Sequence, residues 1–184
     1  MRVCLVGETN VGKTTLCKQI INQKNFITSP TIGCEFFSTT HKGHKIEIWD
    51  TAGQERYKAL LPMYLRKAKI IIYVISAIDL ENENYSYWIK YIKKNADINH
   101  KIIIVITKCD INKKYKQDLV YLKNYIKDPT ILFKYNNNIS NKLLNTIIYS
   151  FNNIKETTNI NYTEDNYISL NDNDFRNKKP KCCS

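Results

Sequence analysis

The chain alternates between short apolar runs and longer stretches in which apolar residues recur every three or four positions. The runs at 70–75 and 102–106 lack regular polar alternation, which is typical of strands buried on both faces of a parallel sheet. The longer stretches predict helices between the strands. We predict strands at residues 2–6, 34–41, 45–50, 70–76, 101–107 and 131–135. We predict helices at residues 13–22, 85–95, 115–127 and 140–154, and a short one near 57–64.

The order of these elements predicts a doubly wound α/β fold. Lys42, Gly43 and His44 form a turn between two segments of alternating polarity, so one hairpin supplies an antiparallel strand. Helices between the other strands imply parallel pairing, with ligands bound beyond the carboxyl ends of the strands. We therefore expect a six-stranded, mostly parallel sheet with one antiparallel strand and about five helices.

Length and composition divide the 184 residues into one folded domain and a tail. Residues 1–154 are expected to form the domain. Apolar residues thin out after Lys155, so residues 155–184 are expected to be a flexible tail. No apolar run reaches the roughly 18 residues of a membrane span. The first strand begins at once and Arg2 follows Met1, so we expect neither a signal peptide nor N-myristoylation.

The formal net charge of +11 does not by itself identify a partner. Lysines and arginines are scattered, and no basic stretch is interleaved with aromatic residues, so we expect no nucleic-acid binding. The three histidines form no ligand set. Four of the six cysteines are expected to be reduced thiols, namely Cys4, Cys17, Cys34 and Cys109.

The segment GETNVGKT at residues 7–14 carries the first chemical signal, because it fits the phosphate-binding loop G-x-x-x-x-G-K-[ST]. It lies between an apolar strand and a helix, as that motif requires. Backbone N–H groups of such a loop cradle phosphates. Lys13 adds a positive charge near the β- and γ-phosphates, and the Thr14 hydroxyl is a ligand suited to Mg²⁺. The nucleotide contacts assigned to this loop are Glu8, Thr9, Asn10, Val11, Gly12, Lys13, Thr14 and Thr15.

A second signal ends the strand at 45–50. Asp50 is placed to hold the Mg²⁺, and the Gly53 N–H to meet a γ-phosphate. Gln54 is placed to orient an attacking water. Together with the phosphate loop, these residues indicate hydrolysis of a nucleoside triphosphate.

A third signal, TKCD, ends the strand at 101–107. The Asp110 carboxylate can accept two hydrogen bonds from guanine, a pair of donors that adenine lacks. The stem of Lys108 can lie along the base, and Thr107 opens the motif. The combination favours GTP and GDP over adenine nucleotides.

The ordered set GETNVGKT, SPTIGCEF, KIEIWDTAGQERY and TKCD resembles a small GTPase of the Ras superfamily. TIGCEF, IEIWDTA, ERYKAL and MYLRKA resemble Rab segments, and GQERYKALLPMYLR is most similar to the early-endosomal branch of Rabs. The resemblance covers about residues 2–154. It implies the P-loop small-GTPase fold and a GTP-hydrolysing switch that cycles between GTP and GDP with Mg²⁺.

The resemblance also implies roles for further residues. Thr31 matches the switch I threonine that ligates Mg²⁺ and senses the γ-phosphate, and Gln54 matches the switch II glutamine. The effector-binding hydrophobic triad falls on Phe36, Trp49 and Tyr64, and the aromatic residue that stacks on guanine falls on Phe26.

Several positions depart from the family pattern. Thr9 and Asn10 stand where relatives often carry small residues, so added bulk beside the γ-phosphate is expected to slow hydrolysis. Thr107 replaces the commoner asparagine. The fifth family motif, usually Ser-Ala-Lys, aligns with residues 132–134, where Phe133 and Lys134 keep the lysine but lose the small residues.

The C-terminus ends in Cys182-Cys183-Ser184 and resembles the Rab double-geranylgeranyl site. Two lipid chains, or one chain with basic residues, are needed for stable anchoring. The resemblance therefore implies a monomer on the cytoplasmic face of endosomal or vesicular membranes, with a soluble cytosolic pool. It also implies an exchange factor, an activating protein, GDI-type escort proteins and effectors as partners.

Two alternatives are left open by the sequence. The departures at Thr9 and in the fifth motif allow a GTP-binding scaffold with little intrinsic hydrolysis. A P-loop ATPase or kinase is the other alternative, and the segment from Thr107 to Asp110 argues against it.

Overall fold

The computed structural model describes residues 1–23, 27–78, 80, 85–112, 131–134 and 139–154. Its six-stranded sheet has the order β2-β3-β1-β4-β5-β6. The strands are β1 (Arg2–Val6), β2 (Cys34–His41), β3 (His44–Thr51), β4 (Ile70–Ser76), β5 (Lys101–Thr107) and β6 (Ile131–Lys134). The helices are α1 (Lys13–Ile20), the 3₁₀ helix η1 (Glu55–Leu60), α2 (Leu61–Leu65), α3 (Tyr85–Asn95) and α5 (Ile139–Asn152). The helix predicted at 115–127 and the tail predicted at 155–184 lie outside the described residues.

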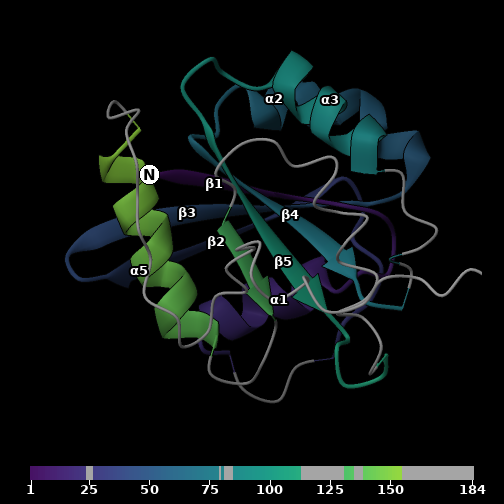
Figure 1. The fold of residues 1–184 in the computed structure, drawn as a ribbon, viewed down its shortest axis with the longest axis horizontal. Coiled ribbons are helices and arrows are strands. Elements are labelled where there is room, and N and C mark those ends of the chain that lie inside the picture. The colour runs from purple at the N-terminus through teal and green to yellow at the C-terminus, as the bar shows by residue number, and fades with distance from the viewer. Residues whose placement is uncertain (24–26, 79, 81–84, 113–130, 135–138, 155–184) are drawn as a thin grey trace, which may run out of the picture.

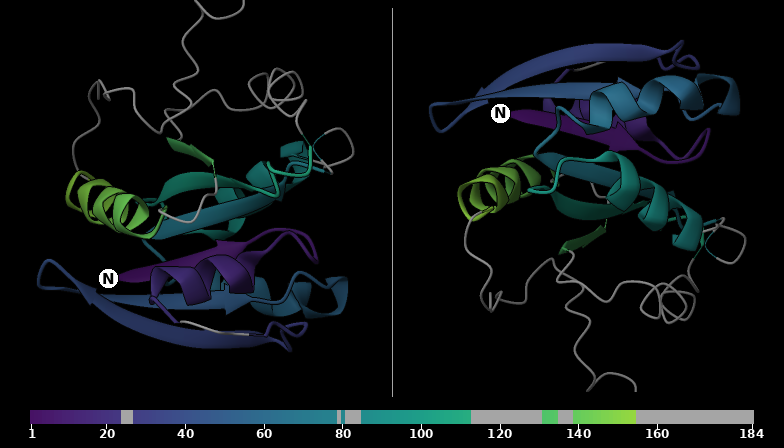
Figure 2. Two further views of the ribbon diagram at one scale, coloured as in Figure 1. Left: turned by 90° about the horizontal axis from the view of Figure 1, so that it is seen from below. Right: turned by 90° about the horizontal axis from the view of Figure 1, so that it is seen from above.

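The sheet is parallel except for its β2–β3 hairpin. Lys42 and Gly43 both have positive φ at the hairpin turn, 49° and 78°, as a type I′ turn requires. Helices α2 and α3 cover one face of the sheet, and α1 and α5 cover the other (Figures 1 and 2). The predicted mostly parallel α/β architecture with one antiparallel strand is therefore confirmed.

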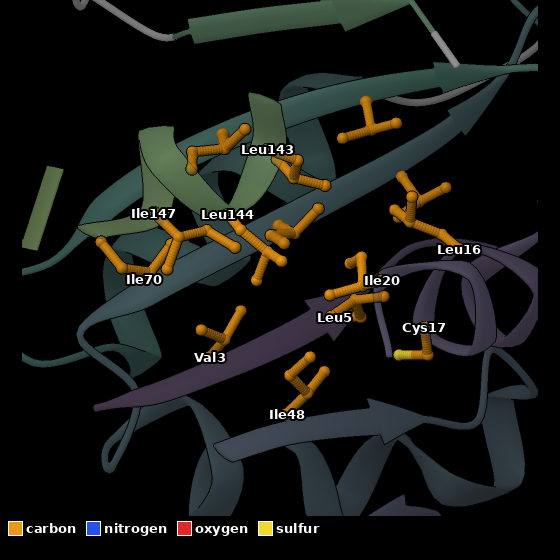
Figure 3. Packing of buried hydrophobic residues seen from close by; sticks show 14 of the residues in the cluster. Val3, Leu5, Leu16, Cys17, Ile20, Ile48, Ile70, Leu143, Leu144 and Ile147 are labelled. Atoms are coloured by element: carbon orange, nitrogen blue, oxygen red, sulfur yellow. The ribbon is translucent and has the colours of Figure 1, made fainter. Parts of the chain in front are cut away.

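Strand β4 shows why the central strands lack polar alternation. Ile70, Ile72 and Val74 pack on the α1–α5 side, whereas Ile71 and Tyr73 pack on the α2–α3 side. Every residue of β4 is buried. Figure 3 shows the hydrophobic cluster on the α1–α5 side of the sheet. In it, side chains of α1 and α5 meet those of β1, namely Leu16, Ile20, Leu143, Ile147, Val3 and Leu5.

Two helices differ from their predicted bounds for local reasons. The short helix near 57–64 is a 3₁₀ turn followed by α2, and Pro62 stands in the first turn of α2, where a missing N–H is tolerated. Helix α1 ends at Ile20 rather than at residue 22, because Asn22 adopts a left-handed conformation with φ 56°. No helix among the described residues is long and apolar enough to cross a bilayer.

Gly7 joins β1 to the following loop, and its position has no room for a side chain. Its φ is 143°, and a Cβ there would lie 2.2 Å from the backbone oxygen of Val74. We expect Gly7→Ala to lower the free energy of unfolding by at least about 3 kcal/mol, since both strain and overpacking apply. Gly43→Ala is the matched control, because a Cβ at Gly43 meets nothing within 4 Å and only strain of about 1–2 kcal/mol applies. Urea unfolding of both variants checks this, and equal losses would contradict it.

Candidate functional site

A cavity of about 240 Å³ lies where the loop after β1 leads into α1. It is bordered by the phosphate loop, by residues 28–31 (the switch I segment) and by the start of residues 53–60 (the switch II segment). Its lining residues are Thr9, Asn10, Gly12, Lys13, Thr14, Thr15, Thr28, Ser29, Pro30, Thr31, Thr51, Gly53 and Gln54. The cavity therefore combines three segments that the sequence predicted to share one ligand.

The phosphate loop has the geometry of an anion site. Asn10 and Gly12 adopt positive φ of 63° and 95°, which turns the chain sharply into α1. Gly12 precedes α1 without any side-chain cap. The first N–H groups of a helix have no intrahelical partner, so an anion can satisfy them.

Lys13 is buried at the base of this loop, with 6% of its surface exposed. Its ammonium donates to the carbonyl oxygens of Gly7 at 2.9 Å and Glu8 at 2.7 Å. The loop thus wraps around its own lysine. These two bonds fix the position of the positive charge at the base of the cavity.

Thr14, Thr31 and Asp50 converge from α1, switch I and β3. The Thr14 hydroxyl donates to Asp50 Oδ2 at 2.5 Å and lies 3.0 Å from the Thr31 hydroxyl, which itself lies 3.3 Å from Asp50 Oδ2. The predicted metal ligands are therefore brought together.

Asp50 is fully buried, and its second oxygen, Oδ1, has no hydrogen-bond partner among the described residues. Burial raises the pKa of this carboxyl above its ordinary value of 3.8, while the Thr14 bond and the Lys13 charge act in the opposite direction. A buried carboxylate oxygen without a partner is costly unless a cation satisfies it. Carboxylate and hydroxyl oxygens are the donors that Mg²⁺ prefers, so the residues fit that ion.

Gly53 places the switch II segment directly against the phosphate loop. A Cβ at Gly53 would lie 2.5 Å from both the Glu8 carbonyl carbon and the Thr9 nitrogen. Gln54, the next residue, lines the cavity, and its Oε1 accepts a 2.8 Å bond from Arg56 Nε. Arg56 was not among the predicted site residues. Thr28, Ser29 and Pro30 were not predicted either, although they directly precede Thr31 in the sequence.

The segment from Thr107 to Asp110 reaches the site through a side-chain clamp. The Thr107 hydroxyl donates to the Val11 carbonyl of the phosphate loop at 2.6 Å and lies 3.1 Å from the Ile75 carbonyl oxygen. Lys108 follows with a positive φ of 55°, and Asp110 is exposed. Among the described residues, Lys108 and Asp110 do not line the cavity.

The three predicted effector residues lie together on β2, β3 and α2. Phe36 pairs with Trp49 across the β2–β3 hairpin and is 58% exposed. The Trp49 and Tyr64 rings meet edge to face with centroids 5.0 Å apart. Arg2 lies 5.6 Å from the centre of the Trp49 ring. The patch therefore joins the β2–β3 hairpin to helix α2 through one aromatic contact.

The other predicted site residues are placed only in part. Phe133 and Lys134 belong to β6, opposite Val105 and Ile106 of β5. Phe26, Cys182 and Cys183 lie outside the described residues.

A doubly wound sheet with this loop at its carboxyl edge defines a P-loop nucleotide-binding protein. The family described as Ras of Complex, Roc, domain of DAPkinase matches residues 2–110. Ras-related protein Rab-31 of Rattus norvegicus is 36% identical over 132 residues, which is 68% of this chain and 67% of the relative. Ras-related protein Rab-22A of Homo sapiens is 37% identical over 121 residues, 60% of each chain. The chain belongs to the Rab family of Ras-related small GTPases and is a GTP hydrolase.

A viral protein described as a probable Rab-related GTPase, from Acanthamoeba polyphaga mimivirus, is 34% identical over 119 residues. That match covers 61% of this chain and 55% of the viral protein. Family membership confirms the resemblance drawn from the sequence motifs and argues against the alternative of a P-loop ATPase or kinase.

Proposed function

We propose that this Rab-type GTPase is a Mg²⁺-dependent switch that cycles between GTP and GDP on endosomal or vesicular membranes. The observation that carries the proposal is the meeting of Thr14, Thr31 and Asp50 around a buried carboxylate oxygen without a partner. One of these residues belongs to switch I, so the same atoms that would hold a metal also decide where switch I lies.

The roles of the chain's own residues follow from their positions. The phosphate loop and the start of α1 bind the phosphates, and Lys13 carries the compensating charge. Gln54 orients the attacking water from the edge of the cavity. Thr14, Thr31 and Asp50 would hold Mg²⁺, which when bound neutralises charge on the β- and γ-phosphates.

Switching follows from Thr31 and Gly53. Thr31 closes switch I over the cavity, and Gly53 seats switch II on the Glu8–Thr9 peptide. In the proposed GTP complex the terminal phosphate would bind beside both segments. Its loss removes partners from both segments and releases them, which is the order-to-disorder switch of this class of GTPase.

We further propose that specificity for guanine comes from Lys108 and Asp110, which the Thr107 clamp ties to the phosphate loop. Effectors would bind the patch of Phe36, Trp49 and Tyr64, because Phe36 is exposed and the Trp49–Tyr64 contact joins β3 to α2. An activating protein, an exchange factor and escort proteins act in trans.

Membrane attachment is proposed through Cys182 and Cys183 at the end of a tail that begins at residue 155. The similarity of residues 53–66 to early-endosomal Rabs and the match to Rab-31 and Rab-22A support this location. The folded domain is proposed to be residues 1–154.

Asp50→Asn tests the metal site. We expect Mg²⁺ to strengthen GTP binding by at least about tenfold in the parent chain and by less than about twofold in the variant, since a neutral amide is a poorer ligand for a hard cation. Titration calorimetry with GTP, GDP and ATP, with Mg²⁺ or with EDTA, measures this. Equal Mg²⁺ dependence in the two chains would contradict the site. Absence of GTP binding by well-folded parent protein would overturn the proposed function itself.

The raised pKa of Asp50 sets the sign of the pH dependence. Protonation removes the charge, so Mg²⁺-dependent affinity is present above the folded-state pKa and is lost as the pH falls through it. Stability of the nucleotide-free protein follows the opposite course. Its folded-state pKa lies above the ordinary value of 3.8, so this carboxyl favours folding at low pH and loses that contribution as the pH rises through the folded-state pKa.

A further inference from the structure

The phosphate loop contains an acidic residue, Glu8, in a place built to bind anions. Like charges a few ångströms apart repel, and a partly buried setting screens them less than water does. The described residues that line the cavity do not include Glu8. Its carboxylate oxygen Oε1 instead accepts a 2.8 Å hydrogen bond from the indole Nε1 of Trp88, 80 residues away.

Trp88 is a tightly packed residue in the first turn of α3. It is 1% exposed, and its ring lies 5.9 Å from the Tyr73 ring of β4, measured between centroids. The indole N–H therefore has a fixed direction. A side chain that bonds to it is held against α3, on the side of the sheet opposite to α1.

The backbone of Glu8 contacts both Lys13 and the start of switch II. Its carbonyl oxygen accepts the 2.7 Å bond from the Lys13 ammonium. Gly53 packs on the peptide that joins Glu8 to Thr9. Any shift of Glu8 would therefore move both the lysine that compensates the phosphates and the start of switch II.

Switch II also rests on the same part of α3. The Lys58 ammonium lies 5.4 Å from the centre of the Trp88 ring and 5.0 Å from that of Tyr87. The Tyr91 hydroxyl donates to the Lys58 carbonyl at 3.0 Å. Trp88 thus contacts the phosphate loop through its N–H and switch II through its ring.

We propose that Trp88 is a positioning residue for triphosphate binding, because it holds the Glu8 carboxylate away from the phosphate cradle and keeps the Glu8 carbonyl on Lys13. The inference rests on the proposed nucleotide site and adds a residue outside the family motifs. The effect grows with the charge of the ligand, so GTP depends on Trp88 more than GDP does.

Trp88→Phe tests this, since it keeps an aromatic ring and removes the N–H donor. The smaller ring also leaves a cavity in the core, for which the rescue below is the control. We expect the affinity for GTP with Mg²⁺ to fall about tenfold, equivalent to about 1.4 kcal/mol, and the affinity for GDP to fall less than about threefold. A non-hydrolysable GTP analogue and GDP, titrated by calorimetry at low and high salt, measure both. The difference between the two ligands is expected to shrink at high salt.

A rescue experiment distinguishes an effect of the Glu8 charge from a packing defect at Trp88. Glu8→Gln alone keeps an acceptor for the Trp88 N–H and is the reference chain against which the double variant is compared. Glu8→Gln in the Trp88→Phe background removes the released charge, and is expected to restore the affinity for GTP to within about threefold of the parent's. A packing defect at Trp88 would not be repaired in this way.

Tyr85→Phe is the matched control on the same helix. It removes the buried hydrogen bond from Tyr85 to the Leu80 carbonyl, far along the chain from the phosphate loop. It is expected to lower Tm while leaving the ratio of GTP to GDP affinity unchanged. The inference is overturned if Trp88→Phe leaves GTP affinity intact, if it weakens GTP and GDP equally, or if Glu8→Gln fails to rescue. None of these outcomes would contradict GTP binding by the parent chain.

Discussion

Replacing Lys13 with alanine is expected to reduce the affinity for both GTP and GDP at least about 100-fold, equivalent to about 2.8 kcal/mol. Lys13 is the buried cation of the loop, and its ammonium is held by the carbonyls of Gly7 and Glu8 at the base of the cavity. Charge-assisted hydrogen bonds in a water-poor site are about twice as strong as neutral ones. Removing the lysine also leaves the two carbonyls without their partner, so the empty loop loses its shape.

Lys142→Ala provides the matched control, because Lys142 is an exposed lysine on α5 and alanine favours helices. Its affinity for both nucleotides is expected to equal the parent's. Calorimetry on the three proteins gives the comparison. A Lys13→Ala chain that still binds GTP within tenfold of the parent would show that the phosphates are held elsewhere.

Gln54→Leu is expected to slow single-turnover hydrolysis of GTP by about 100-fold or more while changing GTP affinity less than about threefold. Misplacing a reacting group by about 1 Å costs on the order of 10²-fold in rate, and Gln54 is the residue that orients the attacking water. Leucine keeps the volume but has no polar atom to orient water. The measurement is the release of phosphate from a preloaded protein in one turnover.

The structure adds a detail to this expectation. Gln54 Oε1 is bonded to Arg56 Nε at 2.8 Å on an exposed part of switch II. While it persists, that bond directs the Gln54 side chain toward Arg56 instead of toward an attacking water, so hydrolysis without an activating protein is expected to be slow. A fast parent rate would contradict this.

Gln23→Leu is the control for Gln54→Leu, since it makes the same chemical change at an exposed position beyond α1. Its rate is expected to equal the parent's. If Gln54→Leu also hydrolysed GTP at the parent's rate, hydrolysis in this chain would not use Gln54.

The predicted strands 70–76 and 101–107 agree with β4 and β5 residue by residue. Both are unbroken runs rich in isoleucine and valine, and such a run has few conformations in which every side chain can be buried. The α1 terminus and the division of the short helix into η1 and α2 were harder to predict. They depend on single residues, Asn22 and Pro62, whose effect on a helix end is worth only a few tenths of a kcal/mol to a few kcal/mol.

The sequence alone was sufficient to predict the class of fold, the phosphate loop and the resemblance to the Rab family, because each depends on residues that are neighbours in the chain. Tertiary structure alone decided which side chains meet. Thr14 reaches Asp50 across 36 positions, and Glu8 reaches Trp88 across 80. A hydrogen bond depends on a separation of about 3 Å and a direction, and no periodicity in the chain encodes either for residues so far apart.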